Sequence, residues 1–273
     1  KLEPFSILPF NAVDSLILAE FSYIRLDHMV PGLSWWKAPV KIGDLLKAEH
    51  FQSMFQNARD LEKSRRFVYA LAASPRFRNT RVHYYASNSD AAMEKQFSAC
   101  TFFLEDKTAY IAYRGTDSTY VGWKEDFNMA YMSSVPAQQE GVKYLNTVAR
   151  WIPRSVGLRV GGHSKGGNIA VYSAVQCDLA VQKRIVSVFN HDGPGFKDNI
   201  FSSAEFIRLQ DRIHTTIPED AVVGMLLQHH ENYRVIKSSA HGIMQHDPFT
   251  WNIEQNDFSY SNKLKNSASV RSK

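Results

Sequence analysis

The stretch LRVGGHSKGGNIAVYSAV, residues 158–175, decides the fold, because a short apolar strand passes through a glycine-rich bend into a helix. Within the bend, Gly162-His163-Ser164-Lys165-Gly166 fits the pattern G-x-S-x-G. A bend this sharp holds the Ser164 hydroxyl out from the backbone, and it requires small residues two positions before and two positions after the serine. The first N–H groups of the helix favour negative charge at the same point. The stretch therefore predicts a nucleophilic serine.

Strand-like and helix-like segments alternate around this bend. The expected strands, rich in β-branched, aromatic and apolar residues, are 82–87, 97–106, 108–115, 158–164, 184–192, 212–220 and 233–239. The expected helices are 140–152 and 167–182, and Asp106 and Lys107 predict a hairpin-like turn. This alternation predicts an α/β fold with a mainly parallel central sheet and helices on both faces. Ligands of such sheets bind at the carboxyl ends of the strands.

The N-terminal part, residues 1–80, is expected to be largely helical. Residues 12–25 have helical spacing of their apolar positions, with Asp14 and Ser15 as candidate caps. Residues 45–75 also have a helical pattern. We therefore expect helices to precede the strands in this chain.

A loop interrupted by proline and glycine, residues 28–46, carries Trp35 and Trp36. We interpret the two tryptophans as core residues, with an apolar rim facing the substrate as the alternative. The whole chain is expected to be a single domain, 1–273, in which 82–251 is the catalytic core.

The net charge of +5 is concentrated in the tail, residues 258–273, which has four basic residues and no acid. The rest of the chain is therefore close to neutral, which argues against a basic nucleic-acid groove. We expect the tail to be solvated and disordered, with a weak contact to an anionic surface as the alternative. The sequence does not indicate an oligomeric state.

The composition, 44% hydrophobic and 22% charged residues, is that of a folded protein and excludes disordered and fibrous classes. The two cysteines, Cys100 and Cys177, cannot form a disulfide framework or a zinc site. We expect both to be reduced and buried, which favours a cytoplasmic location. No apolar run is long enough to span a membrane. The N-terminus does not resemble a signal peptide. The sequence begins with Lys1 and not with methionine, so a leader that has been removed is the alternative.

A second motif, Tyr110-Ile-Ala-Tyr-Arg-Gly-Thr116, ends another expected strand, with Trp123 and Asp126 shortly after it. Acyl transfer needs a second N–H donor beside the one that follows the nucleophile. Thr116 is placed to supply that donor, and the N–H of Lys165 is expected to supply the first. The alternative interpretation of this motif is an ordinary strand end.

The chain resembles the class-3 lipases, which are α/β-hydrolase-fold serine esterases. The resemblance lies in the order of its motifs, which is YIAYRGT, then W-x-x-D, a helix and GHSKGG. The later stretches FNHDGPGF, IPEDAVVGMLL and GIMQHDPFTW are similar to a less characterised bacterial branch of these hydrolases. The resemblance covers residues 82–251 and implies an α/β-hydrolase fold. One departure is Lys165, because class-3 lipases usually have leucine after the nucleophilic serine.

In α/β-hydrolases the order of the catalytic residues is serine, acid, histidine. Asp220, at the end of the expected strand 212–220, is our predicted acid. Asp192, at the end of the preceding strand, is the alternative acid, and Glu219 is a weaker one. Asp220 could instead cap the helix that follows it.

The base is expected on a loop beyond the last strand, where the resemblance favours His246 and His241 is the alternative. His163, inside the bend, is expected to point away from the serine and to pack, and His214 is expected to be structural. His229 and His230 are adjacent, so their side chains diverge and make a weak case for a metal site. We predict that the protein uses no metal and no other cofactor.

The Lys165 side chain is expected to pair with Asp117 or Asp192 or to meet a polar or anionic part of the substrate, with exposure to solvent as the alternative. The segment 118–136 contains Tyr120, Val121, Met129, Tyr131 and Met132, and class-3 lipases have a lid near this place. A mobile apolar cover is one interpretation of it, and ordinary packing is the other.

The predicted function is a serine esterase or lipase-like hydrolase that cleaves a small-molecule ester or lipid through an acyl-enzyme. A thioesterase, an amidase or an acyltransferase would use the same triad. A hydrolase fold that binds a lipid or a protein without catalysis is an alternative of another class, and it would predict a missing triad residue. We expect no nucleic-acid partner and no membrane span. A weak contact of the protein with a membrane interface is the alternative.

Overall fold

The computed structural model describes residues 2–56, 58, 60–90, 92, 95–116, 134–196, 200, 202–226, 232–262 and 264. Its main sheet has the strand order β1-β2-β3-β4-β5-β6-β7-β8-β11, and a second ribbon pairs β9 with β10. The strands are β1 Val40–Lys41, β2 Arg81–Asp90, β3 Lys95–Phe103, β4 Thr108–Tyr113, β5 Gly157–His163, β6 Ile185–His191, β7 Ile213–Pro218, β8 Tyr233–Ile236, β9 Ile253–Glu254, β10 Asp257–Phe258 and β11 Tyr260–Ser261.

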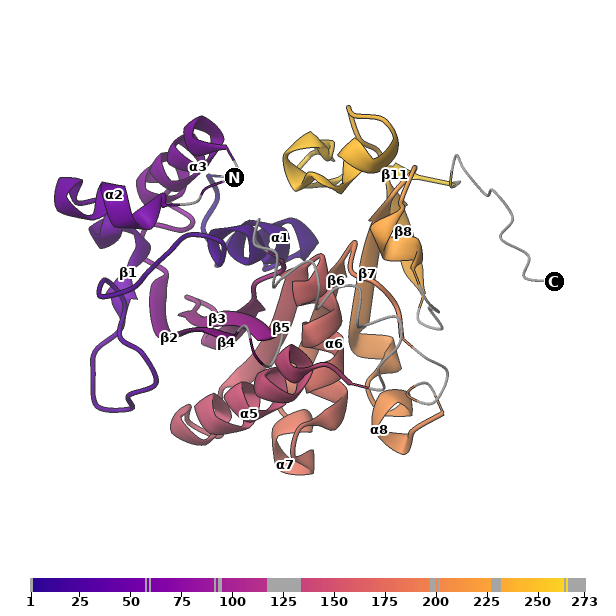
Figure 1. Cartoon of the computed structure of the whole chain (residues 1–273), viewed down its shortest axis with the longest axis horizontal. Coiled ribbons are helices and arrows are strands. Elements are labelled where there is room, and N and C mark those ends of the chain that lie inside the picture. The colour runs from indigo at the N-terminus through magenta and orange to yellow at the C-terminus, as the bar shows by residue number, and fades with distance from the viewer. Residues whose placement is uncertain are drawn as a thin grey trace.

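The described α-helices are α1 Ala12–Phe21, α2 Phe51–Met54, α3 Leu61–Ala73, α5 Pro136–Trp151, α6 Lys165–Gln176, α7 Leu179–Gln182 and α8 Ala204–Ile207. The described 3₁₀ turns are η1 Ile42–Leu45, η2 Ala48–His50, η4 Gln210–Arg212, η5 Val223–Met225, η6 Gly242–His246 and η7 Pro248–Thr250. The chain thus begins with helices and continues with alternating strands and helices (Figure 1).

Strands β4 to β8 are parallel to one another, whereas β1, β2, β3 and β11 are antiparallel to their neighbours. The predicted hairpin between β3 and β4 is confirmed, and Lys107 in its turn has a φ of 62°. The mainly parallel sheet places the carboxyl ends of β4 to β8 along one edge.

Side chains alternate along the central strands, so that each face of the sheet is packed against its own helices. On β4, Ile111 and Tyr113 lie in the core cluster formed with α5 and α6. Tyr110 and Ala112 lie in the opposite cluster, formed with α1 and α3. Figure 1 shows α5 and α6 side by side and α1 lying across β4, β5 and β6. The predicted α/β architecture, with helices on both faces of a mainly parallel sheet, is confirmed.

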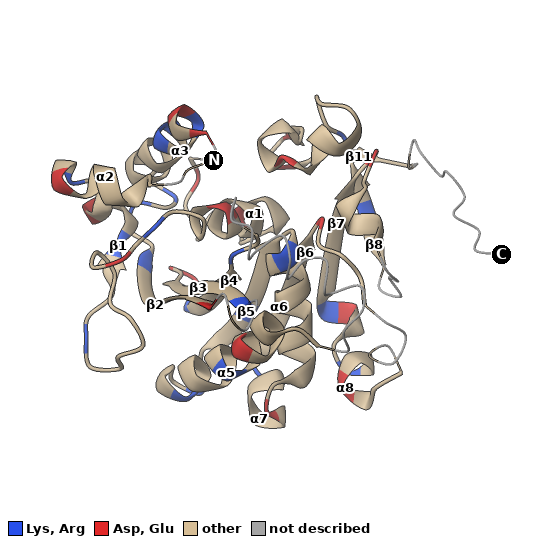
Figure 2. Cartoon of the chain, in the orientation of Figure 1, with Lys and Arg blue, Asp and Glu red and all other residues tan. Residues whose placement is uncertain are grey.

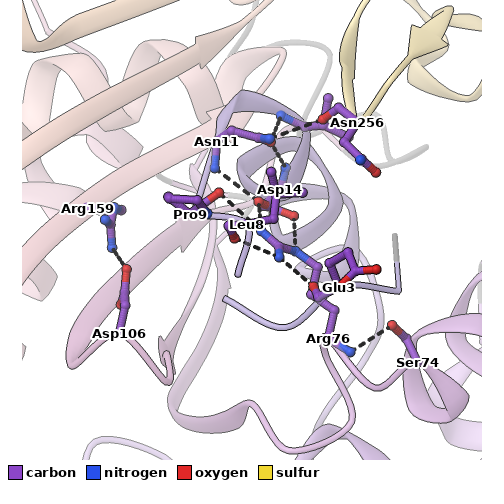
Figure 3. A network of polar contacts seen from close by, with 11 residues as sticks. Glu3, Leu8, Pro9, Asn11, Asp14, Ser74, Arg76, Asp106, Arg159 and Asn256 are labelled. Carbon is purple, nitrogen blue, oxygen red and sulfur yellow. Dashed lines mark hydrogen bonds and ion pairs between the residues drawn. The ribbon is translucent and has the colours of Figure 1, made fainter. Parts of the chain in front are cut away.

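Helix α1 is fixed to the rest of the chain by a buried ion pair between Asp14 and Arg76 (Figure 3). Both side chains are fully buried. The guanidinium donates in bidentate fashion, from Nε to Oδ1 at 2.8 Å and from Nη2 to Oδ2 at 2.6 Å. The remaining N–H groups of the guanidinium donate to the backbone carbonyls of Glu3, Leu8 and Pro9. This network ties the N-terminal segment to the end of α3.

The N-cap of α1 is Asn11, and not Asp14 or Ser15 as predicted. The Asn11 side chain accepts from the N–H of Val13 and of Asp14, and Asp14 accepts from the N–H of Asn11. This is a reciprocal capping box, in which Asp14 occupies the third helical position and not the cap.

The predicted helix over 45–75 is broken into the short turns η2 and α2 and the longer helix α3. Trp35 and Trp36 are 66% and 69% exposed, so the prediction that they are core residues is wrong. Their rings pack edge to face with centroids 5.9 Å apart. Both cysteines are buried as predicted, and burial raises the pKa of Cys177 to about 12.

Charges of both signs are distributed over the described ribbon, and α3 carries both of them (Figure 2). Most of the tail lies outside the described residues, although Phe258 ends β10 and Tyr260–Ser261 form β11. Within the described part of the chain, no helix is both long and apolar enough to cross a membrane.

A buried histidine links α1 to the sheet and makes stability depend on pH. His191 Nε2 lies 2.9 Å from Ser15 Oγ, and Nδ1 lies 2.7 Å from Thr216 Oγ1. Burial lowers the pKa of His191 from 6.5 to about 3. The unfolded chain therefore binds a proton between these two values that the folded chain does not bind, so stability falls as the pH falls through this window.

We expect the free energy of unfolding to fall by about 2 kcal/mol more between pH 7 and pH 5 in the natural protein than in His191→Gln. Urea unfolding at both pH values measures this difference. The comparison does not depend on how far the substitution itself lowers the free energy of unfolding at pH 7. Equal losses in the two proteins would contradict the assignment of this pH dependence to His191.

Candidate active site

Ser164 lies in a strained bend between β5 and α6. Its φ of 58° is in the left-handed region, which residues with a side chain seldom adopt. A Cβ on Gly162 would clash with the backbone of Gly166 and would lie 2.6 Å from the carbonyl oxygen of Tyr113. A Cβ on Gly166 would also clash with that carbonyl. The glycines two positions before and after the serine are therefore required by close approach of the backbone.

Ser164 and His246 are brought together, as predicted. His246 ends η6, in the loop after β8, and its Nε2 lies 3.0 Å from Ser164 Oγ. On the other side of the ring, Nδ1 lies 2.5 Å from Asp192 Oδ2. A carboxylate only accepts hydrogen bonds, so Nδ1 carries the proton and Nε2 is left to accept from the serine hydroxyl.

Asp192 is held rigidly where it meets the histidine. Its side chain is fully buried, and its Oδ1 accepts from the N–H of Gly224 at 3.0 Å. Its own N–H donates to the carbonyl of Thr216 at 2.8 Å. Both carboxylate oxygens therefore have a donor, which fixes the orientation of the carboxylate toward the ring.

Asp192, the alternative acid, occupies the position that we predicted for Asp220. The reason is the register of the sheet, in which His163 of β5 is paired with His191 of β6. The next residues, Ser164 and Asp192, therefore leave two neighbouring strands side by side. Asp220 follows β7, one strand further away, and strands are about 4.8 Å apart.

Asp220 instead supports the loop that carries His246. Its Oδ2 accepts from the N–H of Gly242 at 3.3 Å and from Gln245 Nε2 at 3.2 Å. Its N–H donates to Gln245 Oε1 at 2.8 Å. Asp220 does not cap the turn η5, whose N-cap residue is Val222. Glu219 is buried, and its N–H donates to the carbonyl of Ile236.

The other histidines lie in different surroundings. His241 is exposed at the start of η6. His163 is buried with its ring close to that of His246, at a centroid distance of 4.7 Å. His214 packs against the ring of Phe189, at a centroid distance of 5.2 Å. His229 and His230 lie outside the described residues, and the described residues hold no group of three His, Cys, Asp or Glu arranged for a metal.

The two predicted oxyanion donors follow the ends of two neighbouring strands, β5 and β4. Lys165 is the first residue of α6, directly after the serine. Thr116 follows β4 and is buried. Its neighbour Gly115 lies so close to the bend that a Cβ there would be 2.7 Å from the carbonyl oxygen of His163 and 3.2 Å from Ser164 Cβ. The end of β4 thus lies in close contact with the serine. A second N–H donor to the oxyanion has to lie this near to the nucleophile.

The Lys165 side chain is buried, with only 1% of its surface exposed. Its Nζ donates to the carbonyl of Gln96 at 3.3 Å. The interpretation of a solvent-exposed side chain is therefore wrong. The carboxylate of Asp192 is occupied by His246 and Gly224, and Asp117 lies outside the described residues.

A cavity of about 500 Å³ opens beside this site. Residues of the sheet line one side of it, namely Ser87, Ser89, Gln96 and His163, together with Arg114 after β4. Residues of the first 67 positions and of the segment 243–249, which includes His246, line the rest. Trp35 and Trp36 are not among the described residues that line it. The expected lid and its apolar side chains, within 118–136, fall almost wholly outside the described residues, as do Trp123 and Asp126.

Comparison with solved structures finds lipases with low sequence identity. A propeptide complex of Rhizomucor miehei lipase is 18% identical with a TM-score of 0.43, and the match covers 58% of this chain and 57% of that chain. Lipase II from Rhizopus niveus is 16% identical with a TM-score of 0.42, covering 57% and 67%. The M37 lipase is 15% identical with a TM-score of 0.46, covering 77% and 69%. No curated protein matches the sequence.

The mainly parallel sheet, the helices on both its faces and the serine in the bend after β5 define an α/β-hydrolase fold. A family model described as Mbeg1-like matches residues 71–273, which is most of the chain. The chain therefore belongs to the Mbeg1-like family. The bacterial branch suggested by the later motifs stays a prediction.

Proposed function

We propose that this protein is a serine hydrolase that cleaves carboxylic esters through an acyl-enzyme, with Ser164, His246 and Asp192 as its triad. The observation that carries the proposal is the continuous line of contacts from Asp192 Oδ2 to His246 Nδ1 at 2.5 Å and from His246 Nε2 to Ser164 Oγ at 3.0 Å. These atoms lie within the distances that proton transfer between a nucleophile and its base requires.

The reaction begins when Ser164 Oγ attacks the ester carbonyl and His246 Nε2 takes the hydroxyl proton. Asp192 accepts from Nδ1–H and stabilises the imidazolium. His246 then returns the proton to the leaving alcohol, and the acyl group stays on Ser164. Water attacks the acyl-enzyme with His246 as base, which releases the acid and restores the serine.

The N–H groups of Lys165 and Thr116 would hold the negative oxygen of the tetrahedral intermediates. Two features support this assignment: Lys165 begins α6, whose N-terminal dipole favours negative charge, and the end of β4 lies against the bend. The chemistry then uses only side chains and backbone N–H groups of this chain, with no metal and no cofactor.

The substrate would be a small-molecule ester or lipid bound in the cavity beside His246. That cavity has apolar side chains such as Met54 and Phe67 and polar ones such as Gln96. A volume of about 500 Å³ is within the range of small-molecule sites.

Labelling with a fluorophosphonate probe tests the proposal. We expect the natural protein to take up one phosphonyl group on Ser164, located by peptide mass spectrometry, and Ser164→Ala to remain unlabelled. His246→Ala is expected to label at least a hundredfold more slowly, because the serine has lost its base. His241→Ala, which changes the exposed alternative base, is the matched control and is expected to label at the natural rate.

An unlabelled natural protein would contradict the proposal and favour a hydrolase fold that binds without catalysis. If the natural protein is labelled, a series of p-nitrophenyl esters with increasing acyl length defines the preferred acyl chain, with the phosphonylated protein as the inactive control.

A further inference from the structure

His163, between Gly162 and Ser164 in the bend, has a side chain that faces two hydrogen-bond acceptors. Its Nε2 lies 3.0 Å from the carbonyl oxygen of His246. Its Nδ1 lies 3.1 Å from Glu20 Oε1, which comes from α1. Both side chains are removed from water, with exposures of 4% for His163 and 14% for Glu20. The pair therefore connects the N-terminal helix to the residue proposed as the base.

The contacts fix the orientation of the His163 ring. A carbonyl oxygen only accepts, so Nε2 of His163 carries a proton and donates a hydrogen bond to the carbonyl of His246. On the other side of the ring, Glu20 Oε1 is a buried atom without a hydrogen-bond partner among the described residues, and it lies 3.1 Å from Nδ1. The Glu20 side chain thus lies against the ring and keeps Nε2 turned toward His246.

This contact fixes the catalytic histidine at a second point. The ring of His246 is held by Asp192 through Nδ1, and its backbone carbonyl is held by His163. The two imidazole rings are inclined by 32° with centroids 4.7 Å apart. His246 ends the 3₁₀ turn η6, whose hydrogen bonds have poorer geometry than those of an α-helix, so a further contact to its carbonyl adds to the support that the loop receives from Asp220.

The other titratable groups near His163 do not replace Glu20 in this role. From β6, His191 stays neutral because burial lowers its pKa to about 3. After α1, Tyr23 Oη contacts the carbonyl of His163 at 3.5 Å and not its ring nitrogens. Arg114 lines the same cavity, and the structure pairs neither ring nitrogen of His163 with it.

We propose that Glu20 and His163 form a positioning pair that holds His246 in register with Ser164. The inference rests on the proposed function and adds to it two residues that line the cavity and act through His246, without contact with the reacting atoms. Glu20 acts by orienting the ring of His163, and His163 acts by holding the carbonyl of His246.

Hydrolysis of p-nitrophenyl butyrate tests the pair in the full chain. We expect His163→Ala to lower kcat about tenfold to a hundredfold, because a small displacement of the base is costly, while KM stays within about twofold. His163→Gln is expected to recover most of kcat, since its amide can donate to the His246 carbonyl. Glu20→Ala is expected to lower kcat about tenfold alone and to have no further effect in the His163→Ala background.

Glu62→Ala, on the exposed start of α3, is the matched control and is expected to keep the natural kcat. Hydrogen exchange of the peptide 240–252 gives a readout that needs no activity. Exchange there is expected to be about tenfold faster in His163→Ala and unchanged in Glu62→Ala.

Three results would overturn the positioning pair: an unchanged kcat in His163→Ala, additive effects of the two alanine variants, or unchanged exchange in the loop. If the natural protein neither hydrolyses the ester nor takes up the fluorophosphonate, the proposed function fails. The exchange measurement still decides whether the pair holds the loop.

Discussion

Asp192→Asn is expected to lower kcat for ester hydrolysis by roughly 10⁴-fold, with little change in KM. The carboxylate of Asp192 accepts a hydrogen bond from His246 Nδ1–H, at 2.5 Å. An amide in its place can turn its NH₂ group toward the ring, which moves the imidazole proton to Nε2. The nitrogen that faces Ser164 would then donate and could no longer take the hydroxyl proton. Steady-state kinetics with p-nitrophenyl butyrate measure the effect.

Asp220→Asn is the matched variant, because both carboxylates follow neighbouring parallel strands. Asp220 accepts from Gly242 and Gln245 at the same oxygen, Oδ2, and an uncharged asparagine oxygen in that place can still accept these bonds, although more weakly. We expect kcat to fall by less than about tenfold, since only the support of the loop is weakened. A larger loss in Asp220→Asn than in Asp192→Asn would return Asp220 to the triad and refute the acid proposed above.

Asp14→Ala is expected to lower the free energy of unfolding by about 3–5 kcal/mol. The substitution leaves Arg76 fully buried, with its guanidinium opposite a cavity where the bidentate carboxylate lies. It also removes the acceptor for the N–H of Asn11 in the capping box. Urea unfolding followed by tryptophan fluorescence and by far-UV circular dichroism measures the loss.

Arg150→Ala is the control for that measurement. Its ion pair with Asp178 spans 3.2 Å, but the two side chains are 70% and 52% exposed. Exposed pairs contribute about 0–1 kcal/mol, so this variant is expected to unfold close to the natural protein. Equal losses in the two variants would show that the Asp14–Arg76 pair adds no more stability than a surface pair.

The sequence carried a strong signal for the strands, the helices of the core and the serine bend. Each of these features depends on neighbours in the chain: a run of β-branched, aromatic and small apolar residues for β4, an apolar run after the bend for α6, and the two glycines around Ser164. A bend of this geometry admits few side chains, so its sequence pattern is restrictive.

The acid could not be chosen from the same kind of signal, because it depends on the pairing of strands. Asp192 and Asp220 both follow strands, and only the register of His163 with His191 shows which of them meets His246. The sequence contains one hint, since GGHS and FNHD end two successive strands with the same histidine before a polar residue. Glu20 left no such signal, because its partner His163 is 143 positions away.

The N-terminal misjudgements also have physical causes. Asn11 outcompetes Asp14 and Ser15 as the cap because its side chain accepts from two N–H groups, while Asp14 is engaged by Arg76. The helical pattern of 45–75 is interrupted where the chain leaves α2 and begins again at the cap Asp60. Such choices depend on partners that a local pattern does not contain.

The close contact between α1 and the sheet bears on where this protein can be shortened. The matched family segment begins at residue 71, after α1, yet α1 lies so near β5 that a Cβ on Gly161 would reach Ser15 Oγ at 3.0 Å. A fragment limited to the matched segment would leave the apolar side chains of Tyr110 and Ala112 without their helical cover. An uncovered sheet face of this kind promotes aggregation, so shortened versions for expression should retain the first helix.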